Sequence, residues 1–99
     1  MGQVVKVARV EDVPEGEGLS VVHGRERIAL FKVNGAIHAV SDVCPHAGGP
    51  LSEGWVDDGC VTCPWHGWTF DLVNGNGKDD GLFRYKVSCE GDDVYIEVP

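Results

Sequence analysis

Short segments in which apolar and polar residues alternate run through most of the chain. The alternation is clearest at Leu82–Ser88 and Val94–Val98, and Val4–Arg9 has a similar spacing. No segment keeps its apolar residues at the 3.6-residue period of a helix. The pattern therefore predicts an all-β fold, built as a small antiparallel sandwich or barrel.

Turn residues divide these segments into hairpins. Asn34-Gly35 lies between two apolar runs, and Asn-Gly is the strongest short hairpin signal. Gly24-Arg25 predicts another hairpin just before it. Glycine and proline crowd the stretch from Asp42 to Gly67, where the alternation stops. We therefore expect one domain, residues 1–99, with a β base formed by about 3–41 and 68–98 and a loop-rich insert at about 42–67.

The charge of the chain narrows its possible partners. Sixteen acidic residues face eight basic ones, which gives a net charge of −8 over 99 residues. Such a surface repels nucleic acid and anionic lipid, and it suits a partner with a basic docking face, although charge also simply keeps a small protein soluble. The first residues resemble no signal peptide, and no apolar run is long enough to span a membrane. We expect a cytoplasmic protein that is a monomer when isolated.

Two short motifs in the insert supply metal-binding side chains. Cys44-Pro45-His46 is followed, after sixteen residues, by Cys63-Pro64-Trp65-His66. Two thiolates and two imidazoles suit a Rieske 2Fe–2S cluster, in which one iron takes the sulfurs and the other the nitrogens. A single zinc ion accepts the same four ligands, so a zinc-stabilised interaction module is the alternative from another class. The repeated Cys-then-His order favours the cluster.

The glycines of the insert suit the same purpose. Gly48, Gly49 and Gly67 lie within or beside the two motifs and let the backbone approach closely. Backbone N–H groups could then face the sulfurs, and hydrogen bonds to sulfur influence the reduction potential of a cluster.

The two motifs in their wider context resemble a known family. The segments Cys44–Ser52 and Cys63–Asp71 resemble the two cluster-binding boxes of Rieske ferredoxins, above all the soluble ferredoxins of bacterial aromatic-ring-hydroxylating dioxygenases. The chain is also similar to the small subunit of NADH-dependent nitrite reductase. The resemblance extends over nearly the whole chain and implies the Rieske fold.

The resemblance also implies what the residues do. Cys44 and Cys63 would bind the inner iron, and His46 and His66 the outer one. Electrons would pass through the exposed edge of the two imidazoles, and Pro45, Pro64 and Trp65 would shield the cluster and form part of a docking face. The chain would be no enzyme. It would carry one electron at a time from a flavin-dependent reductase to a terminal oxygenase, or serve as a subunit of a nitrite reductase-type complex.

Two departures from related proteins refine this expectation. Rieske proteins of cytochrome bc-type complexes carry an extra cysteine in each box, joined as a disulfide. The corresponding residues here are Gly49 and Trp65, so that disulfide is absent and the resemblance implies a reduction potential in the lower part of the Rieske range. The loop after the second box, Asn74–Gly81, also lacks the proline that the family often has there.

The remaining cysteines and histidines receive no ligand role. Cys60 lies three residues before Cys63, and we expect a small buried side chain that faces away from it. Cys89 has no assigned role. His23 and His38 belong to predicted hairpin strands away from the two boxes.

Three aromatic residues, Trp55, Trp68 and Phe70, lie in or just after the insert. Large aromatic side chains dominate the cores of small domains. We expect all three to pack the insert against the base.

Overall fold

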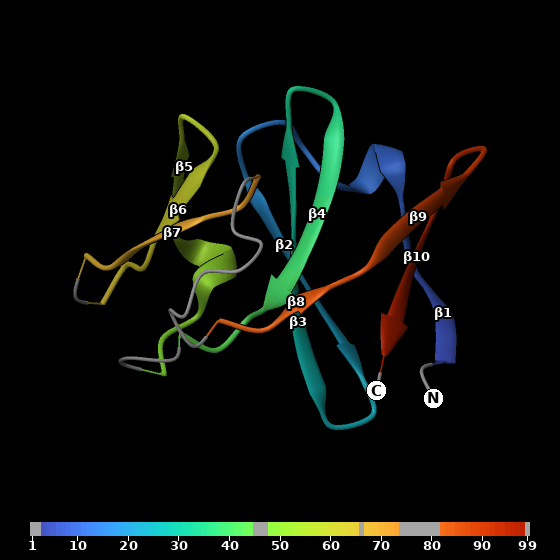
Figure 1. Ribbon diagram of the computed structural model, residues 1–99, viewed down its shortest axis with the longest axis horizontal. Coiled ribbons are helices and arrows are strands. Elements are labelled where there is room, and N and C mark those ends of the chain that lie inside the picture. Colours follow the sequence, from blue (N-terminus) through green and yellow to red (C-terminus); the bar gives the residue numbers. More distant parts are fainter. Residues whose placement is uncertain (1–2, 45–47, 66, 74–81, 99) are drawn as a thin grey trace.

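Three antiparallel sheets make up the computed structural model, which describes residues 3–44, 48–65, 67–73 and 82–98 (Figure 1). The first sheet has the order β1-β10-β9, the second β2-β3-β4-β8 and the third β5-β6-β7. Two short 3₁₀ helices, η1 and η2, are the only helical elements in the described part of the chain. The all-β antiparallel prediction is confirmed.

The strand bounds follow the sequence order. They are β1 (Gln3–Arg9), β2 (Gly18–His23), β3 (Glu26–Val33), β4 (Ala36–Ser41), β5 (Trp55–Asp57), β6 (Cys60–Thr62), β7 (Thr69–Asp71), β8 (Arg84–Tyr85), β9 (Val87–Glu90) and β10 (Asp93–Val98), with η1 at Val10–Asp12 and η2 at Leu51–Glu53.

The predicted hairpin turns are present because their residues accept the required backbone angles. Asn34 and Gly35 both have positive φ, 50° and 82°, as a two-residue turn between β3 and β4 requires. Asp58 and Gly59 repeat this arrangement between β5 and β6, with φ of 51° and 75°. Gly24-Arg25 joins β2 to β3 as predicted. Local turn chemistry thus fixes the register of three hairpins.

The first two sheets form the base and share one core. Ile28 and Leu30 of β3 face Ile96 and Val98 of β10, and all four side chains are buried in one hydrophobic cluster. The alternation of β10 is visible in its burial, since Val94, Ile96 and Val98 are buried and the residues between them are half-buried. Burying such side chains stabilises the fold by about 1.5–3 kcal/mol each.

The third sheet contains β5, β6 and β7, so the inserted part of the structure continues past the expected end at about residue 67 as far as Asp71. Its inner face packs on the base. Val56, Val61 and Phe70 lie opposite one another across β5, β6 and β7, and they join the same cluster as Phe31 of β3. Phe70 therefore packs the insert against the base, as predicted. The prediction is wrong for the two tryptophans, because Trp55 is 64% exposed and Trp68 is 48% exposed.

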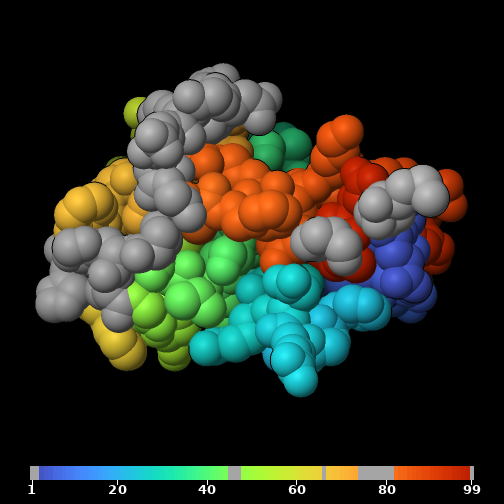
Figure 2. Space-filling view, turned by 60° about the horizontal axis from the view of Figure 1, so that its bottom comes forward, coloured from blue at the N-terminus to red at the C-terminus, as the bar shows by residue number. Residues whose placement is uncertain are grey.

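One predicted strand is divided between two sheets. The segment 82–88 was expected to be continuous, but β8 pairs with β4 in the second sheet and β9 pairs with β10 in the first. The break falls at Lys86, where the chain passes from one sheet to the other. In Figure 2 this segment, in orange, lies between the insert in green and gold and the strands of the base in cyan and blue.

Candidate metal centre

The first motif occupies the tip of a small hairpin. Val43 and Pro50 form an antiparallel bridge, and the backbone N–H of Cys44 donates to the carbonyl oxygen of Gly49 at 2.9 Å. The N–H of Gly48 donates back to the carbonyl oxygen of Cys44 at 2.8 Å. This pair of hydrogen bonds closes the loop between Cys44 and Gly49.

The second motif repeats this geometry at the tip of the β6–β7 hairpin. The N–H of Cys63 donates to the carbonyl oxygen of Trp68 at 2.7 Å, and the N–H of Gly67 donates to the carbonyl oxygen of Cys63 at 3.1 Å. The fifth residue of each loop is a glycine in the left-handed region, with φ of 76° at Gly48 and 74° at Gly67. The N–H groups of these two glycines thus close the loops through cysteine carbonyls.

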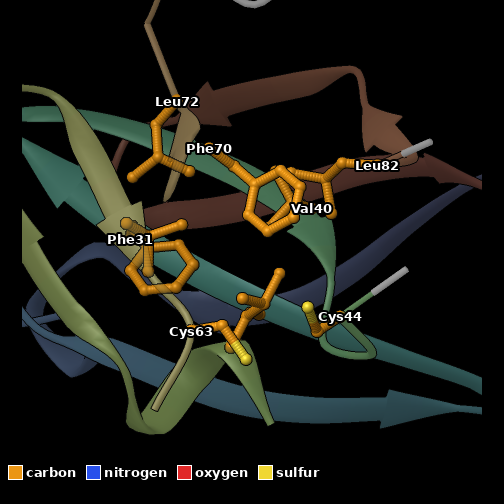
Figure 3. Close-up of a cluster of buried hydrophobic side chains, with 10 residues drawn as sticks. Phe31, Val40, Cys44, Cys63, Phe70, Leu72 and Leu82 are labelled. Carbon is orange, nitrogen blue, oxygen red and sulfur yellow. The ribbon is translucent and has the colours of Figure 1, made fainter. Parts of the chain in front are cut away.

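Both loop cysteines place their sulfur in the same core. Cys44 and Cys63 are buried free thiols in the cluster that contains Phe31, Val40 and Phe70. Figure 3 shows the two sulfur atoms at one edge of this cluster, with Leu72 on the far side. Two buried thiols on matched loops fit the thiolate half of a Rieske donor set.

The two predicted histidine ligands, His46 and His66, lie outside the described residues. Within the described part of the chain, no three Cys, His, Asp or Glu side chains converge on a metal-sized site. The structure therefore brings together Cys44 and Cys63, and the assignment of the two histidines stays a prediction from the sequence.

A buried carboxylate, which the sequence analysis did not single out, fastens the first loop to the base. Asp42 is 1% exposed and lies two residues before Cys44. Its side chain accepts hydrogen bonds from the hydroxyl of Ser20 on β2, at 2.9 Å, and from the N–H and hydroxyl of Ser52 in η2, at 2.7 and 3.1 Å. Its own N–H donates to the carbonyl oxygen of Arg27 on β3. The hydrogen bonds of Asp42 thus connect β2 and β3 of the base to η2 of the insert. We call this group of contacts the Asp42 joint.

The elements connected at the Asp42 joint, β2 and η2, are also closely packed. A Cβ atom on Gly18, at the start of β2, would lie 2.4 Å from the carbonyl oxygen of Ser52 and 2.8 Å from the Phe31 ring. Only glycine lets β2 approach η2 this closely. No local pattern in the sequence marks either Asp42 or Gly18, because their partners are distant along the chain.

Arg84 makes a second connection between insert and base. Its guanidinium donates to the carbonyl oxygen of Asp71 at the end of β7, at 2.9 Å, and to that of Leu82, at 3.2 Å. β8, which carries Arg84, pairs with β4 of the base. The end of the insert is therefore held to the second sheet by a charged donor.

The other cysteines lie away from the paired thiols. Cys60 is half-buried, and in β6 it is opposite Asp57 of β5 and Asp71 of β7. Cys60 and the buried Val61 alternate along the strand, so Cys60 lies on the outer face; the prediction of a buried side chain is wrong. Cys89 is exposed. None of the four cysteines forms a disulfide, and all four belong to the described residues.

The two remaining histidines are in the base strands, as predicted. His23 is exposed at the end of β2, and His38 is half-buried in β4. Partial burial lowers the pKa of His38 below its usual 6.5, because desolvation disfavours the charged imidazole.

Two cavities in the described structure lie away from the two cysteine loops. The larger, about 450 Å³, lies between the Asn34 turn of the base and the Asp58 turn of the insert, and the smaller, about 160 Å³, borders His38 and Tyr85. Neither is lined by Cys44 or Cys63.

None of the helices in the described ranges is long and apolar enough to cross a membrane.

Comparison with known proteins shows to which family this fold and these two loops belong. The family model described as "Rieske [2Fe-2S] domain" matches residues 3–82. The 3-phenylpropionate/cinnamic acid dioxygenase ferredoxin subunit of Shigella boydii is 41% identical over 95 residues, which covers 91% of this chain and 89% of that protein. Human apoptosis-inducing factor 3 is 37% identical over 94 residues, but the chain spans only 16% of its length.

Solved structures agree with the sequence relatives. A chain from a complex of reduced oxygenase and oxidized ferredoxin in carbazole 1,9a-dioxygenase has a TM-score of 0.82 and 28% identity, over 94% of this chain and 91% of that one. Nitrite reductase small subunits share the fold as well.

The chain belongs to the Rieske [2Fe–2S] family. Its cofactor is therefore a Rieske-type 2Fe–2S cluster, which decides between the cluster and the zinc alternative. The curated dioxygenase relative reported above, which this chain covers over 89% of its length, is a ferredoxin subunit, so the chain is an electron carrier of the dioxygenase-ferredoxin type and no catalytic subunit.

Proposed function

We propose that this chain carries single electrons from a flavin-dependent reductase to a terminal oxygenase. The observation that supports this most is the pairing of two buried thiols on matched loops, in a chain that is similar over nearly its whole length to a dioxygenase ferredoxin subunit. A Rieske cluster accepts and releases one electron at a time. The protein supplies the ligands, the shielding and the docking surface.

Four residues would hold the cluster: Cys44 and Cys63 on one iron, His46 and His66 on the other. The two thiols are buried, so the sulfur side of the site is kept from water. Each loop is closed by two backbone hydrogen bonds, which reduces the rearrangement of the ligands when the charge of the site changes. Cluster binding would involve the insert at about residues 42–67 of a single domain.

The acidic surface would guide the partners together. The net charge of −8 favours encounter with basic docking faces and leads us to expect association rates that fall as salt is added. Weak, fast encounters suit a carrier that must dock in turn with a donor and an acceptor. We also propose that the isolated protein is a cytoplasmic monomer.

The test is reconstitution with defined partners. The reductase and oxygenase components of a 3-phenylpropionate/cinnamic acid dioxygenase serve as probes, since the ferredoxin subunit of that system is 41% identical to this chain. With NADH and the reductase, the visible spectrum of the wild-type protein should bleach within one turnover, and the reduced protein should then support product formation by the oxygenase. His38→Gln is the matched control for His46→Gln, and only the latter should abolish transfer.

Two outcomes would count against this function. Failure of the reductase to reduce a fully loaded protein would remove the proposed donor. Co-purification with a large reductase subunit, together with nitrite reduction by that complex, would favour the nitrite reductase alternative.

A further inference from the structure

One contact crosses from one cysteine loop to the other. Gly49 closes the first loop, and Trp65 is the third residue of the second. A Cβ atom on Gly49 would lie 2.7 Å from Cγ and 2.8 Å from Cδ2 of the Trp65 indole. The base of the ring therefore rests directly on the backbone of Gly49.

The burial of the two residues supports the same conclusion. Gly49 is buried, whereas Trp65 is 58% exposed. The indole thus covers Gly49 on one side and faces solvent on the other. A side chain this exposed gains little by burial in a core, so its position depends on the surface beneath it.

Glycine is required at position 49 for space and not for backbone conformation. Gly48 and Gly67 have positive φ, but Gly49 does not. The equivalent position in the second loop is Trp68, a large and exposed residue. Two loops with the same hydrogen bonds therefore differ at this position, and the Trp65 ring explains the difference.

We propose that Trp65 and Gly49 form a noncovalent clasp that keeps the two cysteine loops together and sets how long the cluster stays bound. The hydrogen bonds at Cys44 and Cys63 close each loop separately. A group held by ligands from both loops is released when the loops part, and the Trp65–Gly49 contact opposes that separation. This inference rests on the proposed ligand set, because the group held between the loops is the cluster.

The test is a double-mutant cycle on the holoprotein. Gly49→Ala, Trp65→Ala and the double variant are compared with wild type by the first-order rate at which visible absorbance is lost in air. Each single substitution should accelerate the loss about fivefold or more, within the range of couplings between contacting residues. The double variant should lose its cluster no faster than the Trp65→Ala protein, because the added methyl group then meets no ring.

Two further variants separate the clasp from general effects. Trp55→Ala removes a tryptophan of similar exposure from β5, outside both loops, and should leave the rate unchanged. Trp65→Phe keeps a flat ring against Gly49 and should restore most of the wild-type lifetime. If Gly49→Ala does not retain a cluster at all, recovery of colour in the double variant supports the clasp directly.

The failures of this inference and of the proposed function are distinguishable. Equal acceleration by Gly49→Ala in the presence and absence of Trp65 would overturn the clasp while leaving a coloured electron carrier. A wild-type protein that binds no iron would overturn the ligand set and the clasp together. Loss of electron transfer to the oxygenase by a protein with normal cluster lifetime would overturn only the proposed function.

Discussion

Replacing Asp42 by alanine should weaken the joint between the base and the first cysteine loop. The carboxylate is buried and accepts three hydrogen bonds, from Ser20 and twice from Ser52. Among the described residues, no salt bridge neutralises it. A buried carboxylate is costly to desolvate, so its hydrogen bonds must offset that cost in the native state.

The magnitude follows from the groups left behind. The N–H of Ser52 loses its acceptor in a part-buried site, which costs about 1–3 kcal/mol. The two serine hydroxyls can rotate to other partners, so their lost hydrogen bonds destabilise the protein less. Removing the buried carboxylate also removes its desolvation cost, which offsets part of the loss. We expect a net loss of about 2–3 kcal/mol, equivalent to about 10–20 °C in the unfolding midpoint of a domain this size.

The assay is thermal unfolding of the holoprotein at one fixed scan rate, followed by near-ultraviolet circular dichroism and visible absorbance. One fixed rate keeps the midpoints of the variants comparable, because the apparent midpoint of a protein with a bound cofactor depends on scan rate when cofactor release is slow. Asp42→Asn keeps one acceptor oxygen and should lie between wild type and Asp42→Ala. Glu90→Ala removes an exposed carboxylate from β9 and should change stability by less than about 0.5 kcal/mol.

The outcome that would refute this reasoning is an Asp42→Ala protein that unfolds within about 2 °C of the Glu90→Ala control. The hydrogen bonds would then contribute no more than the buried charge costs. Ser20→Ala provides a further check, because it should lower the midpoint in the wild type but scarcely at all in the Asp42→Ala background.

Three further predictions concern single residues. Gly18→Ala should destabilise the protein by about 1–3 kcal/mol in urea unfolding, because its Cβ would lie 2.4 Å from the carbonyl oxygen of Ser52; an unchanged midpoint would contradict the close approach. Burial first, then the hydrogen bond to Glu26 and its charge, raise the pKa of Tyr85 from 10.0 to about 12. The resulting stability is fully present below pH 10 and is lost as pH rises through about 12, and Tyr85→Phe should flatten unfolding midpoints over that window. Because the pKa of His38 is lowered, its contribution is present above pH 6.5 and is lost as pH falls below it; His38→Gln should reduce that acid loss and leave the visible spectrum unchanged.

The sequence predicts most where the interaction is local. Asn34-Gly35 and Asp58-Gly59 form turns because their residues accept positive φ, and that preference is a property of the dipeptide itself. The alternation of β10 likewise reports its burial. The two cysteine motifs could be recognised because a cysteine and a histidine lie close together in the sequence of each one.

What depends on tertiary contact could not be predicted. Asp42 gains its importance from Ser20 and Ser52, which lie 22 and 10 residues away. The sequence predicted that Gly49 lets the backbone approach another group closely, but it could not identify that group, which is the indole of Trp65 on the other loop. Hydrophobicity predicted a buried Trp55, but the register of the third sheet places it on the outer face, where it is exposed.

The central claim is that two cysteines and two histidines of this chain hold an electron-carrying Rieske cluster. The most direct measurement combines iron and sulfide analysis with pulsed electron–nuclear double resonance. The sample is the dithionite-reduced protein, prepared with and without ¹⁵N-labelled histidine. We predict two irons and two sulfides per chain, and nitrogen couplings from two histidines, as the Rieske donor set requires. The His46→Gln and His66→Gln proteins should lose this signal, and His23→Gln should keep it. A reduced cluster without histidine nitrogen coupling, or a colourless protein that contains zinc and no iron, would contradict the claim.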